Sequence, residues 1–227
     1  MFDPGEVRLD FRTASDIETR PSATYVRVSR KLDDSVLADI AKIVEHDLAI
    51  GALMVSEAGE LTRDELLRLS SNIGRPLHCA PLEGSITTEL QTLGARIAEP
   101  PDIALIYARA QADIVLADFS CFCWRITPAD VAILRQSTGP HGAAGIIYGD
   151  PGRPLLQYDV ANFPPMSESS AAALHALQLG LLVPGVKLKL RIPASSILIL
   201  DTQRMLVSIN NVHNGISGEM LLLRRYC

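Results

Sequence analysis

From about residue 86 onward, the chain consists of short apolar runs separated by turn-forming residues. Each run has the length of a strand, is rich in β-branched and aliphatic residues, and is bounded by Gly, Pro, Asn or Asp, which predicts β-structure. Eight runs in succession are typical of a sandwich or a barrel. They lie at residues 103–107, 114–116, 145–148, 155–158, 186–190, 197–200, 205–209 and 220–225.

The first part of the chain has a helical pattern instead. Apolar residues at helical spacing predict a helix over residues 33–48, and a short strand follows at 52–55. Thr62 and Glu65 form a capping box that predicts the start of a second helix, which Gly74 ends. These elements predict an α/β preface over about residues 1–80.

Two further helices are expected between the strands. Thr127 is the predicted cap of one, and the other is predicted over residues 167–179, closed by Gly180. The sequence contains no internal repeat and no linker rich in Pro or Gly. We therefore expect a single domain over residues 1–227 that is mainly β with flanking helices.

Composition and charge exclude several classes of function. The net charge is -5 and the 21 Lys and Arg residues are scattered, so a nucleic-acid surface is not expected. Residues 1–20 contain no apolar run and the longest apolar stretch, 177–183, is too short to span a bilayer. We expect a cytoplasmic protein with reduced cysteines, in which Cys121 and Cys123 share one face of a strand.

Four segments of the chain resemble one known family in their order. They read GALMVSEAGELTRDELLRLSSNIGRPL, EPPDIALIYARAQADIVLAD, IPASSILILDTQRMLVS and EMLLLRRY. Between the second and the third, GRPLLQYD resembles the substrate-side strand of the same family. In this order they are similar to the taurine dioxygenase and clavaminate synthase-like family of Fe(II)/2-oxoglutarate oxygenases, over about residues 44–226. The resemblance implies a double-stranded β-helix, the jelly-roll barrel whose mouth holds iron in that family.

The same resemblance implies that the usual iron ligands are replaced. The family binds iron through two histidines and one carboxylate. Its His-x-Asp motif falls on Gln91, Thr92 and Leu93, and its distal histidine falls on Val207. None of the five histidines begins a His-x-Asp/Glu step. We therefore expect no metal and no cofactor.

The family's contacts to 2-oxoglutarate also fall on unsuitable residues. Its threonine falls near Ile114, and its first C-terminal arginine falls near Glu219 or Met220. Arg224 matches a second arginine, which relatives use for substrate anions. The resemblance therefore implies a small polar or anionic metabolite as ligand.

The candidate site residues lie at or near the expected barrel mouth, and each has a structural alternative. Arg204 and Arg224 can each pair with a surface acid, Asp118 can face the pocket or solvent, and His213 lies in a turn rich in Asn, Gly and Ser. The candidate catalytic residues are Arg224, Asp118 and His213, and the candidate substrate-binding residues are Gln91, Arg204, Val207 and Tyr148.

Three functions stay open from the sequence. The first is a metal-independent enzyme of isomerase, lyase or cyclase type that uses the old cavity. The second is a catalytically silent binding protein or partner subunit, either a homo-oligomer or paired with a related protein. The third is an Fe(II)/2-oxoglutarate oxygenase with rearranged ligands, through His213 or His78. The interpretation places the first ahead of the second, and both ahead of the third.

Overall fold

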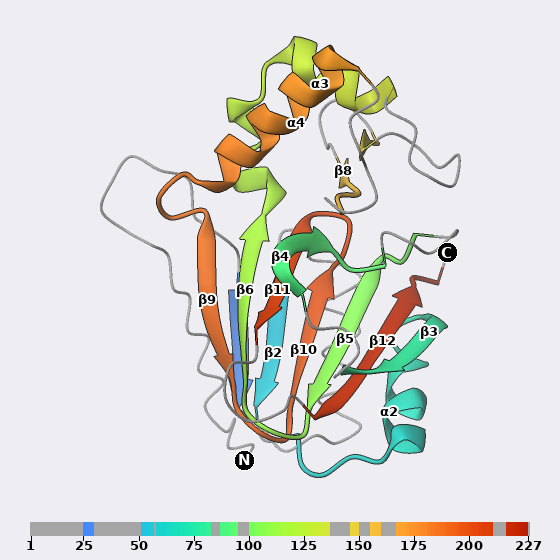
Figure 1. Ribbon diagram of the computed structural model, residues 1–227. Helices are drawn as coiled ribbons and strands as arrows, with labels where there is room; N and C mark the ends of the chain where they lie inside the picture. Colours follow the sequence, from blue (N-terminus) through green and yellow to red (C-terminus); the bar gives the residue numbers. More distant parts are fainter. Residues whose placement is uncertain are drawn as a thin grey trace, which may run out of the picture.

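Two β-sheets pack face to face in the computed structural model, which describes residues 25–29, 51–56, 58–82, 87–94, 100–136, 146–149, 155–159, 167–210 and 217–226 (Figure 1). The six-stranded sheet has the order β1 (Tyr25–Ser29), β2 (Ala52–Ser56), β10 (Ser196–Asp201), β5 (Ile103–Ala108), β12 (Gly218–Arg224) and β3 (Arg75–Pro81). The four-stranded sheet has the order β4 (Thr87–Thr92), β11 (Met205–Asn210), β6 (Ala112–Asp118) and β9 (Lys187–Ile192).

The path of the chain between the sheets defines the fold. Strands β3, β5, β10 and β12 belong to the larger sheet, and β4, β6, β9 and β11 belong to the smaller one. The chain crosses from one sheet to the other at each step except between β6 and β9. These eight strands form a jelly roll, the double-stranded β-helix that the resemblance implies.

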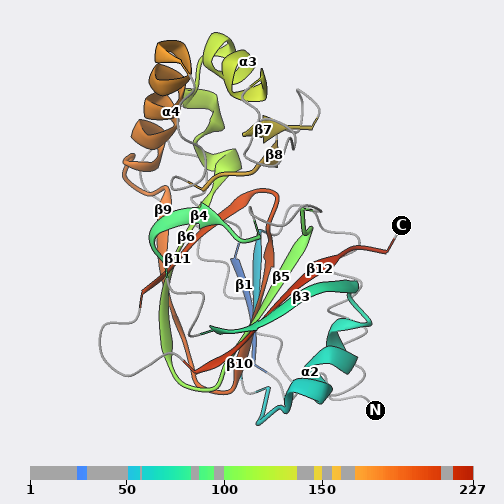
Figure 2. The same ribbon diagram turned by 45° about the vertical axis from the view of Figure 1, so that its right-hand side comes forward.

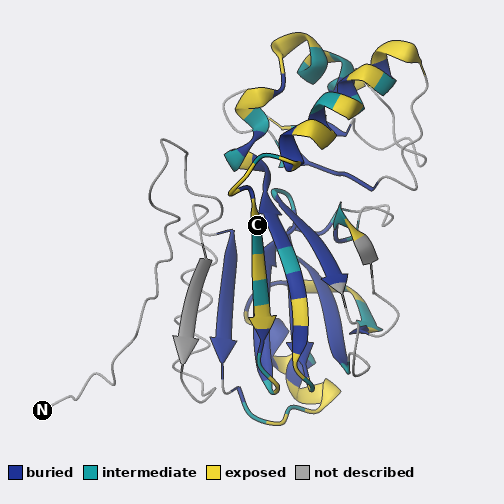
Figure 3. Ribbon diagram, turned by 60° about the vertical axis from the view of Figure 1, so that its left-hand side comes forward, coloured by how far each residue is buried: buried dark blue, intermediate teal, exposed yellow. Residues whose placement is uncertain are grey.

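Alternating side chains of the two sheets form the inner core. Leu116, Val207, Leu200 and Leu222 come from four different strands and are all at most 1% exposed. Their neighbours on each strand point to the opposite faces of the sheets, as expected for a period of two. Figure 3 shows the strands as largely buried.

A helix covers the outer face of the six-stranded sheet. Helix α2 (Arg63–Ser70) begins at the predicted capping box, in which Thr62 Oγ1 accepts a hydrogen bond from the backbone N–H of Glu65 at 3.3 Å. Leu66 and Leu69 pack from this helix onto a second core. The prediction of this helix is confirmed, but the helix ends at Ser70, and the segment from Arg75 onward is already strand β3.

The segment between β6 and β9 forms a helical insert at one end of the barrel (Figure 2). The insert has its own core, in which Phe119, Phe122, Leu134 and Leu177 are buried. Its elements are two 3-10 helices, η2 (Phe119–Cys121) and η3 (Cys123–Arg125), the helices α3 (Pro128–Gln136) and α4 (Glu168–Leu181), and a short hairpin of β7 (Ile147–Tyr148) and β8 (Leu155–Leu156).

Several local predictions are wrong. Gly180 does not end α4, because the helix continues to Leu181 and the missing side chain makes room for Phe122. Cys121 and Cys123 lie on 3-10 helices instead of a strand. The predicted helix at 33–48 lies outside the described residues. No helix in the described part of the chain is long and apolar enough to cross a membrane.

Candidate functional site

The two positions that correspond to the histidine ligands of the family are direct neighbours. Val207 on β11 is the cross-strand partner of Gln91 on β4. Cross-strand partners point to the same face of a sheet. Val207 belongs to the inner core with an exposed fraction of 1%, so the half-buried Gln91 also faces the barrel interior. The register therefore supports the residue-by-residue assignment.

Apolar side chains surround this pair. Leu93, which occupies the carboxylate position, is 4% exposed and packs in the same core as Val207. Met205, two residues before Val207, comes so close to Gly51 that a Cβ atom there would lie 2.6 Å from its sulfur. The barrel interior at this end is therefore packed with hydrocarbon and thioether groups.

Asp118 and Arg204 form a buried ion pair beside this region. Asp118 is the last residue of β6 and is 0% exposed, and Arg204 lies in the turn between β10 and β11. Arg204 Nε donates to Asp118 Oδ1 at 3.1 Å, and Arg204 Nη2 contacts Asp118 Oδ2. Burial opposes the charge of Arg204, but the hydrogen bond and charge of Asp118 prevail and raise the pKa of the guanidinium.

The ion pair also fixes the start of the insert. Asp118 Oδ1 accepts hydrogen bonds from the backbone N–H of Ser120 at 2.9 Å and from its hydroxyl at 2.7 Å, which caps η2. The carboxylate of Asp118 accepts hydrogen bonds from Arg204 and from Ser120, so it joins the insert to the barrel. Asp118 is fully buried and does not face solvent, which was one of the two expected alternatives.

A second polar cluster lies around Asp102, at the start of β5. Arg224 Nε lies 3.4 Å from Asp102 Oδ2, and Arg224 Nη1 donates to the carbonyl of Pro100 at 2.8 Å. The same carboxylate accepts from the backbone N–H of Arg225 at 3.0 Å and from the side-chain amide of Gln203. Arg224 thus pairs with an acid, and its use as an anion anchor stays a prediction.

Tyr148 connects the insert to the second cluster. Burial, followed by the charges of Asp102 and Asp201, raises the pKa of its phenol to about 12, although Arg224 lowers it. The phenol is therefore a neutral hydrogen-bonding group at physiological pH and not a base. Asp201 itself accepts from the backbone N–H of Gln203 at 2.9 Å, which stabilises the turn at the end of β10.

The remaining candidates are scattered. His213 lies outside the described residues, and His78 is exposed on the edge strand β3. Trp124 is 50% exposed, with the guanidinium of Arg125 4.4 Å from its ring centroid. Burial and the charge of Asp118 raise the pKa of Cys121 to about 12, which makes it a poor nucleophile.

The residues at the positions that the resemblance assigns to the iron ligands do not fit iron. Gln91, Leu93 and Val207 cannot supply two imidazoles and a carboxylate. The described residues contain no group of three His, Cys, Asp or Glu that could hold a metal ion. The resemblance places the co-substrate arginine near Glu219 or Met220. Oε1 of Glu219 lies 3.6 Å from Nη2 of Arg109.

The fold is that of known oxygenases. Asparagine oxygenase in complex with Fe(II), 2S,3S-3-hydroxyasparagine and succinate is similar with a TM-score of 0.66 and 14% identity, over 85% of this chain and 80% of that one. The non-heme iron oxygenase OrfP in complex with Fe has a TM-score of 0.65 and 14% identity, with 85% and 79% covered. A taurine dioxygenase from Burkholderia xenovorans has a TM-score of 0.67 and 14% identity, with 92% and 91% covered.

The chain therefore has the fold of the taurine dioxygenase and clavaminate synthase-like oxygenases. No protein-family model matches its sequence, and no curated protein matches it. The structural comparison confirms the fold that the order of the four segments predicts.

The first functional hypothesis is wrong. The similar structures are all oxygenases or dioxygenases, so the fold gives no support to a metal-independent isomerase, lyase or cyclase. The geometry agrees, because Asp118 and Arg204, which such an enzyme would need as acid, base or anchor, neutralise each other in a buried ion pair. Replaced iron ligands were therefore no argument for a new reaction.

Two sets of polar residues were not predicted from the sequence as parts of a site. Asp102 and Gln203 organise the second cluster, and the signal for Asp102 was its place directly before a buried strand. Lys187 and Lys189 alternate with leucines on β9, a pattern that was visible but was interpreted only as a strand.

Proposed function

We propose that this protein is a catalytically silent binding or partner protein built on the oxygenase fold. The observation that supports the proposal is the packed pair of Gln91 and Val207, with Leu93 beside it, at the positions to which the resemblance assigns the iron ligands. Buried aliphatic groups have no lone pair to donate to a cation. The free energy that an ion loses with its hydration shell would therefore not be regained there. The expected ligand is a small polar or anionic metabolite, and the expected assembly is a homo-oligomer or a pair with a related protein.

The test is anaerobic loading of the purified protein with Fe(II), followed by measurement of bound iron and of 2-oxoglutarate turnover to succinate. We expect bound iron to equal that of a heat-denatured sample and no succinate above the protein-free reaction. Stoichiometric iron together with succinate formation overturns the proposal.

A second candidate is an oxygenase with rearranged ligands, which the similarity to three iron oxygenases and dioxygenases favours. It requires ligands from other positions, and His78 and His213 are the histidines to test. If iron binds, the variants His78→Ala and His213→Ala identify its ligands by loss of stoichiometric binding. The variant His175→Ala is the matched control, because His175 is exposed on α4, in the insert.

A further inference from the structure

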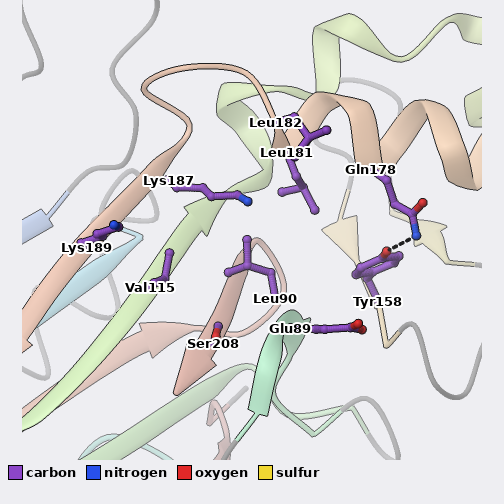
Figure 4. A pocket seen from close by; sticks show the side chains of 10 residues that line it. All are labelled: Glu89, Leu90, Val115, Tyr158, Gln178, Leu181, Leu182, Lys187, Lys189 and Ser208. Carbon is purple, nitrogen blue, oxygen red and sulfur yellow. Dashed lines mark hydrogen bonds between the residues drawn. The ribbon is translucent and has the colours of Figure 1, made fainter. Parts of the chain in front are cut away.

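A cavity of about 480 Å³ lies on the outer face of the four-stranded sheet, below the end of α4 (Figure 4). Val115 and Ser208 alternate along their strands with the inner-core residues Leu116 and Val207, so they point away from the barrel interior. The cavity is therefore separate from the place of iron in relatives. Its lining residues are Glu89, Leu90, Val115, Tyr158, Gln178, Leu181, Leu182, Lys187, Lys189 and Ser208.

The lining is divided into an apolar part and two polar ends of different charge. Leu90, Leu181 and Leu182 supply the apolar part, and Lys187 and Lys189 supply the cationic end from one face of β9 (Figure 4). Both lysines are exposed, so a ligand can reach their side chains from solvent. The opposite end therefore decides how a ligand is oriented.

At the opposite end, Gln178 of α4 donates a hydrogen bond to the phenol oxygen of Tyr158 at 3.3 Å. Glu89 lies on the same side of the cavity as this pair (Figure 4). A negative group of a ligand is repelled from Glu89 and attracted by the lysines. An apolar body can then lie on the leucines between the two ends.

We propose that this cavity binds an amphipathic carboxylate, with its carboxylate at Lys187 and Lys189 and its hydrocarbon body on Leu90 and Leu181. The volume lies within the range of small-molecule sites, roughly 300–1,000 Å³. A lysine ammonium group is a flexible point charge, so it attracts an anion without requiring the two parallel hydrogen bonds that an arginine forms. Because the cavity and the pair of Gln91 and Val207 lie on opposite faces of the sheet, this inference holds whether or not iron binds in the barrel.

The experiment is a titration of the full-length protein with octanoate, octanol and octylammonium, followed by isothermal calorimetry and by amide NMR shifts. Octanoate should bind most tightly, and the variant Lys187→Gln/Lys189→Gln should weaken it about tenfold at low salt. The variant Arg191→Gln is the matched control. It removes one positive charge, where the lysine pair variant removes two, from the next position on this face of β9, where Arg191 Nε lies 3.1 Å from Asp113 Oδ1 and does not line the cavity.

A second variant tests the apolar part without a change of charge. Val115 is half-buried on the cavity floor, so Val115→Phe should fill the space and weaken octanoate binding about tenfold. Thermal unfolding shows whether each variant is folded. If Val115→Phe does not fold, the lysine pair variant still tests whether octanoate binds in this cavity. Equal binding of octanol and octanoate, tighter binding of octylammonium, or unchanged binding by the lysine variant overturns the proposal.

Discussion

Gln91 on β4 and Val207 on β11 are direct cross-strand partners facing the barrel interior, although the whole helical insert lies between them in the sequence. The two positions to which the resemblance assigns histidine ligands are therefore neighbours, and they are occupied by an amide and an aliphatic side chain.

This relationship predicts that two histidines restore a metal site. In the double variant Gln91→His/Val207→His, imidazoles from adjacent strands point to one face and should bind Co(II) or Zn(II) as a pair. The buried polar ring at position 207 should lower the free energy of unfolding by about 1–3 kcal/mol in the absence of metal. Added Zn(II) should then raise the melting temperature by mass action, which differential scanning fluorimetry measures.

The control for this experiment is Gln91→His/Ser208→His. Ser208 is also buried but points to the outer face of the sheet, so the two imidazoles lie on opposite sides. This variant should show no stabilisation by Zn(II) beyond that of the wild type. Equal stabilisation of both double variants would contradict the register of β4 and β11.

The sequence was sufficient for the barrel but not for all of its strands. Strands with continuous apolar runs, such as β5 and β10, are buried on both faces and were predicted from that pattern alone. Strand β3 was missed because it contains Pro76 and Pro81 and no apolar run, whereas a proline is tolerated on this edge strand. Strand β4 was missed because five of its six residues are polar.

The candidate site was predictable only where the resemblance fixes the register. It assigned ligand positions to Gln91 and Val207, which are cross-strand partners, but it did not reveal that Asp118 and Arg204 form an ion pair. A single sequence contains no signal for which of several acids a given arginine contacts. Those partners depend on how the insert packs on the barrel, which is a tertiary property.

Gly180 provides a test of how the insert packs. A Cβ atom at this position would lie 2.9 Å from Cδ2 of Phe122, a ring that is fully buried. Alanine normally stabilises the interior of a helix, but here overpacking should dominate and lower the free energy of unfolding by about 1–3 kcal/mol. Urea denaturation of Gly180→Ala measures this loss.

The double variant Gly180→Ala/Phe122→Leu distinguishes the steric cause from a general helix effect. If the ring is responsible, the cost of alanine should be smaller when leucine is at position 122 than when phenylalanine is there. An equal cost in both backgrounds would show that the contact between α4 and Phe122 is not responsible.

Arg204 should be essential for stability because it neutralises a carboxylate that water does not reach. The variant Arg204→Met leaves Asp118 buried without its guanidinium and should lower the free energy of unfolding by about 3–5 kcal/mol near neutral pH. The exposed pair of Arg191 and Asp113 offers the comparison. Arg191→Met should cost less than about 1 kcal/mol in the same chemical denaturation experiment.

Removal of the carboxylate charge should rescue part of the loss in Arg204→Met. In the double variant Asp118→Asn/Arg204→Met no unpaired charge is left buried, so its free energy of unfolding should be higher than that of Arg204→Met. Urea denaturation of both variants measures this difference. Equal stability of the two variants would indicate that packing by the alkyl chain of Arg204, and not its charge, is the main contribution.

The thiol of Cys121 should react slowly in the folded protein. Burial, and then the negative charge of Asp118, raise its pKa to about 12, so the reactive thiolate is scarce at pH 8. Iodoacetamide labelling followed by peptide mass spectrometry should therefore show modification of Cys121 at least about a hundredfold slower in buffer than in urea. In the folded protein the rate should still rise about tenfold per pH unit between pH 8 and pH 10, because the thiolate fraction grows as the pH approaches the raised pKa. A rate that levels off near pH 9 would show that the thiol has an ordinary pKa and that Asp118 does not act on it.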